Sequence, residues 1–142
     1  MENMKYLLFS TILFFSAVNA FAQCNASLFS QDCVTKVQDG FTFLKSFNID
    51  SQNGAKDKVE YSYVFSKDTQ YYLNICTTDE DKAGIVVTIY DANRKQASTN
   101  LSEGKLYQGL IFECKSTGIY YITYTFKNSP NPCGGSVLAF RR

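Results

Sequence analysis

From residue 41 onward, apolar and polar side chains alternate with a period of two, the pattern of a half-buried β-strand. In the first such segment, Phe41, Phe43, Phe47 and Ile49 share the apolar face, and Lys45 interrupts it, which favours an edge strand. The β-branched run 85–90 predicts a central strand that is covered on both faces. Strands are predicted over residues 41–49, 61–65, 71–75, 85–90, 96–100, 110–112, 119–126 and 137–140.

Polar turn signals separate the predicted strands at short intervals. They include Asn53-Gly54, the run Asp91–Arg94 and Thr117-Gly118. Seven or eight short strands with such spacing predict an all-β fold, an antiparallel β-sandwich with a jelly-roll-like order.

The segment 24–40 has a different pattern. Leu28, Phe29, Cys33, Val34 and Val37 fit one face of a short N-terminal helix, which Asp39-Gly40 would end.

The first residues have the build of a secretory signal peptide. A short polar start with Lys5 is followed by the apolar run Tyr6–Val18 and then by Ala20-Phe21-Ala22, a cleavage pattern of small residues. The apolar run is too short to span a bilayer with any margin. We therefore expect cleavage after Ala22, a single mature domain over residues 23–142 with no stable membrane insertion, and a secreted or periplasmic location.

Charge and composition exclude several functions. The net charge is +1, with 14 basic and 13 acidic residues, so a basic stripe for nucleic acid is not expected. The chain contains no histidine, which removes Ser-His-Asp and Cys-His catalysis and histidine-bound metals. Without histidine or a CxxC pair, a zinc site is also disfavoured.

An ordered set of strand and turn motifs resembles a known family. The strands Glu60–Phe65 and Tyr71–Ile75 are followed by Ile89-Tyr90-Asp91-Ala92-Asn93 and by Thr117-Gly118-Ile119-Tyr120-Tyr121-Ile122. This order is similar to that of bacterial pre-peptidase C-terminal domains, jelly-roll sandwiches related in shape to CUB domains. The resemblance implies a fold more than an activity. No protease domain precedes the segment, so we expect a free-standing module.

Five cysteines fall in the mature chain: Cys24, Cys33, Cys76, Cys114 and Cys133. In an oxidising compartment they predict two disulfides and one remaining thiol. In a jelly roll of the family's order, the ends of the strands favour Cys76–Cys133 and Cys33–Cys114, with Cys24 left over. Cys24 remains an alternative partner in place of Cys33, or a link between two chains.

The only acidic cluster is a candidate calcium site. Asp79 and Asp81 have the alternate spacing of a ligand loop and would offer carboxylate oxygens. The competing interpretation is a solvated loop between strands, and Lys82 weakens its negative field. Apart from this candidate calcium ion, no cofactor is expected.

Ten tyrosines and no tryptophan raise the question of a ligand surface. Tyr72 and Tyr121 fall on the opposite strand faces from the main apolar sets, so we expect them to be exposed. Exposed tyrosines can stack on sugar rings, as in a carbohydrate-binding module, although packing is the more usual use of aromatics in sandwiches.

Catalysis by carboxylates is the remaining alternative. A small hydrolase would need two acids facing each other, and Glu60, Asp91, Glu103 and Glu113 are candidates that nothing in the sequence brings together. We therefore assign no catalytic residue and predict a non-catalytic module that binds a protein or a glycan or supports the cell envelope.

Overall fold

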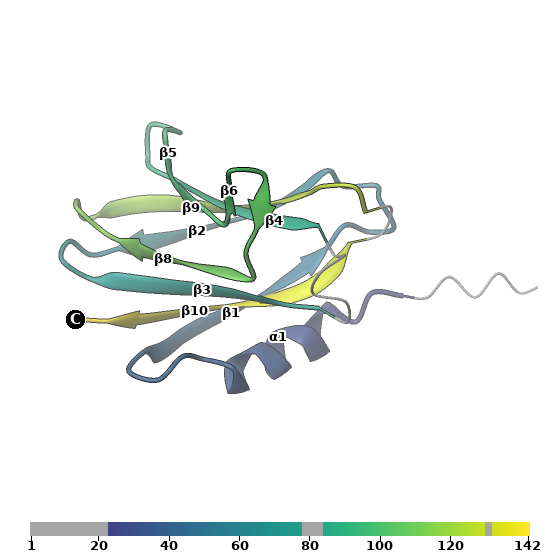
Figure 1. Ribbon diagram of the computed structural model, residues 1–142, viewed down its shortest axis with the longest axis horizontal. Coiled ribbons are helices and arrows are strands. Elements are labelled where there is room, and N and C mark those ends of the chain that lie inside the picture. Colours follow the sequence, from purple (N-terminus) through teal and green to yellow (C-terminus); the bar gives the residue numbers. More distant parts are fainter. Residues whose placement is uncertain (1–22, 78–83, 130–131) are drawn as a thin grey trace, which may run out of the picture.

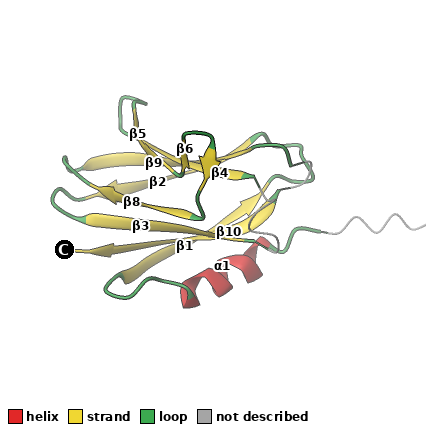
Figure 2. Cartoon of the chain, viewed as in Figure 1, coloured by secondary structure: helices red, strands yellow, loops and turns green. Residues whose placement is uncertain are grey.

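The computed structural model describes residues 23–77, 84–129 and 132–142. The predicted signal peptide and the candidate calcium ligands Asp79 and Asp81 lie outside these ranges. The described chain forms two packed antiparallel sheets and one helix (Figures 1 and 2).

Sheet A has the strand order β1 (Thr42–Asp50), β10 (Cys133–Arg141), β3 (Gln70–Cys76) and β8 (Gly109–Glu113). Sheet B has the order β2 (Lys58–Phe65), β9 (Gly118–Phe126), β4 (Ile85–Tyr90) and β5 (Gln96–Thr99). A small hairpin of β6 (Leu101–Ser102) and β7 (Lys105–Leu106) precedes β8. Apart from β4 and β5, which are consecutive, neighbouring strands in both sheets come from distant parts of the chain, which is a jelly-roll-like order. The predicted fold class is confirmed.

The core lies between the sheets, and alternating residues of each strand fill it. Phe65 of β2 stacks on Tyr71 of β3 and on Tyr120 of β9, with ring centroids 4.0 and 5.1 Å apart. Strand β4 is buried on both faces, as its β-branched run predicts, because Val86 and Thr88 are covered as well as Ile85, Val87 and Ile89.

Strand β1 lies at an edge of sheet A, as Lys45 predicts, but its alternation is not continuous. The pairing of β1 with β10 shifts between Phe43 and Lys45, as at a β-bulge. The shift brings Leu44 against the core and leaves Phe43 43% exposed on the opposite face. The expectation that Phe41 and Phe43 share the core face with Phe47 and Ile49 is therefore wrong.

A buried asparagine secures the β6–β7 hairpin to sheet B. The Asn100 side chain accepts a hydrogen bond from the Val87 N–H and donates to the carbonyls of Ile85 and Tyr107. The backbone carbonyl of Asn100 accepts a hydrogen bond from the Tyr107 N–H. These bonds satisfy the polar groups of a residue that is only 2% exposed, and they position the chain that leads into β8.

The helix α1 (Ala26–Thr35) lies against the outer face of sheet A (Figure 1). A helix is thus confirmed, but only part of the predicted apolar face packs on the sheet: Cys33 is buried with Val37 beside it, whereas Leu28 is 58% exposed. The buried residues are Ala26, Ser30 and Cys33, which are small and let the helix backbone approach the sheet closely. A Cβ atom added to Gly135 of β10 would lie 2.1 Å from the Ser30 nitrogen, so only glycine fits beneath the helix.

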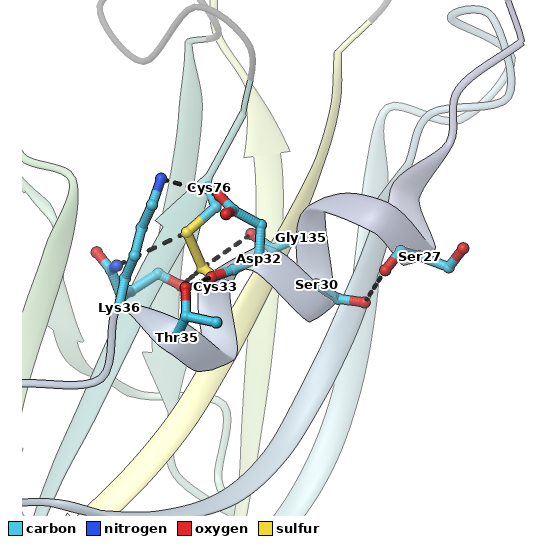
Figure 3. Close-up of a disulfide and its surroundings, with 9 residues drawn as sticks. Ser27, Ser30, Asp32, Cys33, Thr35, Lys36, Cys76 and Gly135 are labelled. Carbon is cyan, nitrogen blue, oxygen red and sulfur yellow. Dashed lines mark hydrogen bonds and ion pairs between the residues drawn. A yellow bond between two sulfur atoms is a disulfide. The ribbon is translucent and has the colours of Figure 1, made fainter.

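Two disulfides attach α1 and its preceding residues to sheet A. Cys24 is bonded to Cys133 at the start of β10, and Cys33 is bonded to Cys76 at the end of β3 (Figure 3). In both pairs the Cα atoms are 5.5 Å apart. Two bridges and one free thiol were expected and are confirmed.

The predicted pairing of these cysteines, Cys76–Cys133 and Cys33–Cys114, is wrong. Cys76 and Cys133 both bond to the N-terminal segment that crosses the outer face of sheet A. Cys114 lies near the turn before β3, as expected, but it belongs to the core between the sheets and is free. The start of β1 does not bring Cys33 close to it, because β1 pairs with β10 rather than with β2.

Candidate functional site

Beyond the helix, an apolar row crosses the outer face of sheet A from one edge to the other. Phe43 of β1 pairs with Ala139 of β10, Ala139 with Tyr72 of β3, and Tyr72 with Ile111 of β8. Their neighbours along the strands, Leu44, Leu138, Leu73 and Leu110, pack in the core, so the row faces outward. Phe43 and Ile111, at its two ends, are 43% and 47% exposed. The row is therefore accessible on both edges of the sheet.

Phe41, in the segment between α1 and β1, packs over the middle of this row. Its ring centroid is 5.4 Å from that of Tyr72, with 44° between the ring planes. The guanidinium of Arg141 lies over the Phe41 ring, 4.6 Å from the ring centroid, in a cation–π contact. Partial burial raises the pKa of the Tyr72 phenol above its usual value. Tyr72 is thus half-buried in the middle of the apolar row, and its ring is not an open surface for stacking.

A second row, of polar side chains, runs beside the apolar row. The Arg141 Nε donates to Gln70 Oε1 at 2.7 Å, and Gln70 Nε2 donates to Glu113 Oε1 at 3.0 Å. Glu113 also pairs with Lys115 at 2.8 Å. The hydrogen bonds from Lys115 and Gln70 hold the pKa of Glu113 below its usual range. We call the two rows together with Phe41 the Tyr72 face; its members are Phe41, Phe43, Gln70, Tyr72, Ile111, Glu113, Lys115, Ala139 and Arg141.

A hollow of about 390 Å³ adjoins the polar row. Lys115, Arg141 and Arg142 line it together with Asp68 and Glu113. The Glu113 carboxylate is already taken by Lys115 and Gln70, and neither arginine has an ion-pair partner among the described residues. The hollow is therefore lined by three basic and two acidic side chains.

Tyr121, the other tyrosine that the sequence singles out, lies on the outer face of sheet B. Its cross-strand partners there are Ser62 and Tyr90. The Arg94 guanidinium covers its ring at 3.6 Å and pairs with Glu60 at 2.8 Å. The pKa of Glu60 is lowered, chiefly by the hydrogen bond from Arg94. Tyr72 and Tyr121 both lie on outer faces, but each is half-buried rather than exposed, and they lie on opposite sides of the sandwich, so they do not form one surface.

The carboxylates considered for catalysis are not arranged as an acid pair. Glu60 lies on sheet B, whereas Glu113 lies at the edge of sheet A. Both have lowered pKa values, the opposite of what a general acid needs. Asp91 Oδ1 accepts hydrogen bonds from the backbone N–H groups of Asn93 and Lys95, which is the chemistry of a turn.

The remaining thiol is held inside the protein. Cys114 is 1% exposed and its sulfur donates to the Ser116 carbonyl. The Tyr120 hydroxyl donates to the same carbonyl at 2.9 Å, and burial together with the hydrogen bond to Cys114 raises the pKa of Tyr120 to about 12. The described residues contain no group of three His, Cys, Asp or Glu side chains that could hold a metal ion.

The sequence pattern identifies Tyr72 but misses the rest of its surroundings. Phe41 and Phe43 were expected in the core, and the β-bulge that turns Phe43 outward has no signal in the alternation. Ile111 falls between Leu110 and Phe112, so its outward position is readable once the strand is assigned. The polar row depends on strand register, which single-strand patterns do not contain.

Comparison with known proteins gives little further information. No family model and no curated protein matches the chain. Among solved structures, the chain is similar to PliG of Aeromonas hydrophila, a periplasmic inhibitor of g-type lysozyme, with a TM-score of 0.44 and 12% identity over 72% of this chain and 85% of that one. No helix of the described residues has the length and apolar character needed to cross a membrane.

Proposed function

We propose that this chain is a non-catalytic module, secreted or periplasmic, that binds a protein through the Tyr72 face. The observation that carries the proposal is the apolar row with Phe43 and Ile111 exposed at its ends and a hydrogen-bonded polar row beside it. An apolar centre with a polar rim is the usual anatomy of a protein interface, and aromatic residues and arginine are enriched there.

A protein partner fits this surface better than a glycan. Stacking on successive sugar rings needs open aromatic faces, whereas Phe41 lies against Tyr72 at 44° and Arg141 lies over Phe41. The packed rings are instead already ordered, which lowers the entropy that is lost on docking.

The cysteines and the predicted signal peptide support a secreted or periplasmic location. Two disulfides within one small domain are typical of oxidising compartments outside the cytoplasm. The lowered pKa values of Glu60 and Glu113 favour a binding module over a carboxylate hydrolase.

Photo-crosslinking in the native host tests the proposal. We expect benzoylphenylalanine in place of Phe43 to capture one discrete protein, because this side chain lies at the accessible edge of the face. The matched control is the same probe in place of Val64, which is 58% exposed on sheet B. Capture of the same protein from both positions, or of none from Phe43, would contradict the proposal.

A further inference from the structure

A groove of about 540 Å³ runs between β8 of sheet A and β5 of sheet B, beside the Tyr72 face. Ala97 and Ser98 line it from β5, and Ile111 and Phe112 line it from β8. Ile111 is also the last residue of the apolar row. The groove is therefore continuous with the face proposed to bind a protein.

Strand β8 offers unpaired backbone groups to this groove. It is the last strand of sheet A, and its pairing with β3 has no bulge. On either side of β8, the Gln108 carbonyl and the Cys114 N–H bond to the β3 side of the ladder. Because opposed residues alternate in an antiparallel pair, Leu110 and Phe112 also bond toward β3. The N–H and C=O groups of Gly109, Ile111 and Glu113 then point away from it.

The charged side chains that line the groove balance one another and favour neither sign of ligand, because Asp91 and Glu113 are acidic and Lys95 and Lys115 are basic. Asp91 accepts hydrogen bonds from its own turn and keeps its negative charge, and Glu113 is held by Gln70 and Lys115. Lys95 also lines the groove and has no ion-pair partner among the described residues. The outward backbone groups of β8, rather than charge, therefore define what the groove can bind.

We propose that this groove binds an extended segment of the partner protein, which pairs with β8 and adds a strand to sheet A. The proposal rests on the proposed function and specifies how the partner is held. Main-chain hydrogen bonds to β8 would supply affinity, and alternate side chains would enter the groove between Phe112 and Ala97. Those on the other side would extend the apolar row beyond Ile111.

The test uses a displayed library of random linear peptides, selected on the folded protein. We expect peptides to be enriched, and their affinity to fall by about tenfold or more in Ile111→Pro, which lacks the outward N–H. Ile111→Ala keeps that N–H and should weaken binding much less. Failure to enrich peptides, or equal binding to Ile111→Pro and the wild type, would overturn the proposal.

Amide hydrogen exchange on the wild-type protein tests strand addition independently, in case the proline variant does not fold. Addition of an enriched peptide should slow exchange at Gly109, Ile111 and Glu113 and leave Leu110 and Phe112 unchanged. Unchanged exchange at Ile111 would also refute strand addition. If these tests fail while the Phe43 probe still captures a partner, strand addition at β8 is rejected, but protein binding through the Tyr72 face is retained.

Discussion

Replacing both Cys24 and Cys133 by serine is expected to lower the free energy of unfolding by about 4 kcal/mol. The bridge joins residues 109 positions apart, so its loss frees a very long loop in the unfolded chain. Removing Cys33–Cys76, with a separation of 43, should have a slightly smaller effect. Urea unfolding followed by circular dichroism measures both.

Cys114→Ser is the matched control for these variants. Cys114 is buried but free, and a serine hydroxyl can donate to the same Ser116 carbonyl, so we expect a change of at most about 1 kcal/mol. Peptide mapping without reduction should recover Cys24–Cys133 and Cys33–Cys76. A bridged peptide that contains Cys114 would contradict the structure.

Gly135→Ala is expected to destabilise the protein by about 3 kcal/mol, because it overpacks the contact between α1 and sheet A. The added Cβ would meet backbone atoms, the Phe29 carbonyl carbon and the Ser30 Cα, each at 2.4 Å. Backbone cannot rotate aside, and the Cys33–Cys76 bridge next to it restrains the helix. Thermal unfolding of the variant measures the loss.

Gly118→Ala provides the comparison, since no atom lies within 4 Å of the Cβ that it would add. We expect its stability to stay within about 0.5 kcal/mol of the wild type. Equal stability of Gly135→Ala and Gly118→Ala would mean that α1 does not rest on β10.

The fold could be predicted from the sequence because burial imposes alternation on each strand separately. Tyr71, Leu73 and Ile75 show it in β3, and Tyr120, Ile122 and Tyr124 show it in β9. The disulfides could not be assigned in the same way. Their partners depend on where α1 crosses sheet A, and its contact face consists of small residues such as Ala26 and Ser30, which carry no amphipathic signal.

The candidate site was predictable only in part for a related reason. Tyr72 is recognised because it alternates with core residues, but the apolar row to which it belongs joins four strands. That row exists because of register between strands and because a β-bulge turns Phe43 outward. Neither property is encoded in the pattern of one segment.

The affinity of the captured partner for two matched variants tests the central claim most directly. Phe43→Ser and Val64→Ser each remove an exposed apolar side chain, from sheet A and from sheet B respectively. Calorimetric titration should show that Phe43→Ser weakens binding by about tenfold or more, as for an interface residue whose truncation costs over 1 kcal/mol. Val64→Ser should bind like the wild type. Unchanged affinity of Phe43→Ser together with weakened binding of Val64→Ser would move the interface to sheet B and contradict the account.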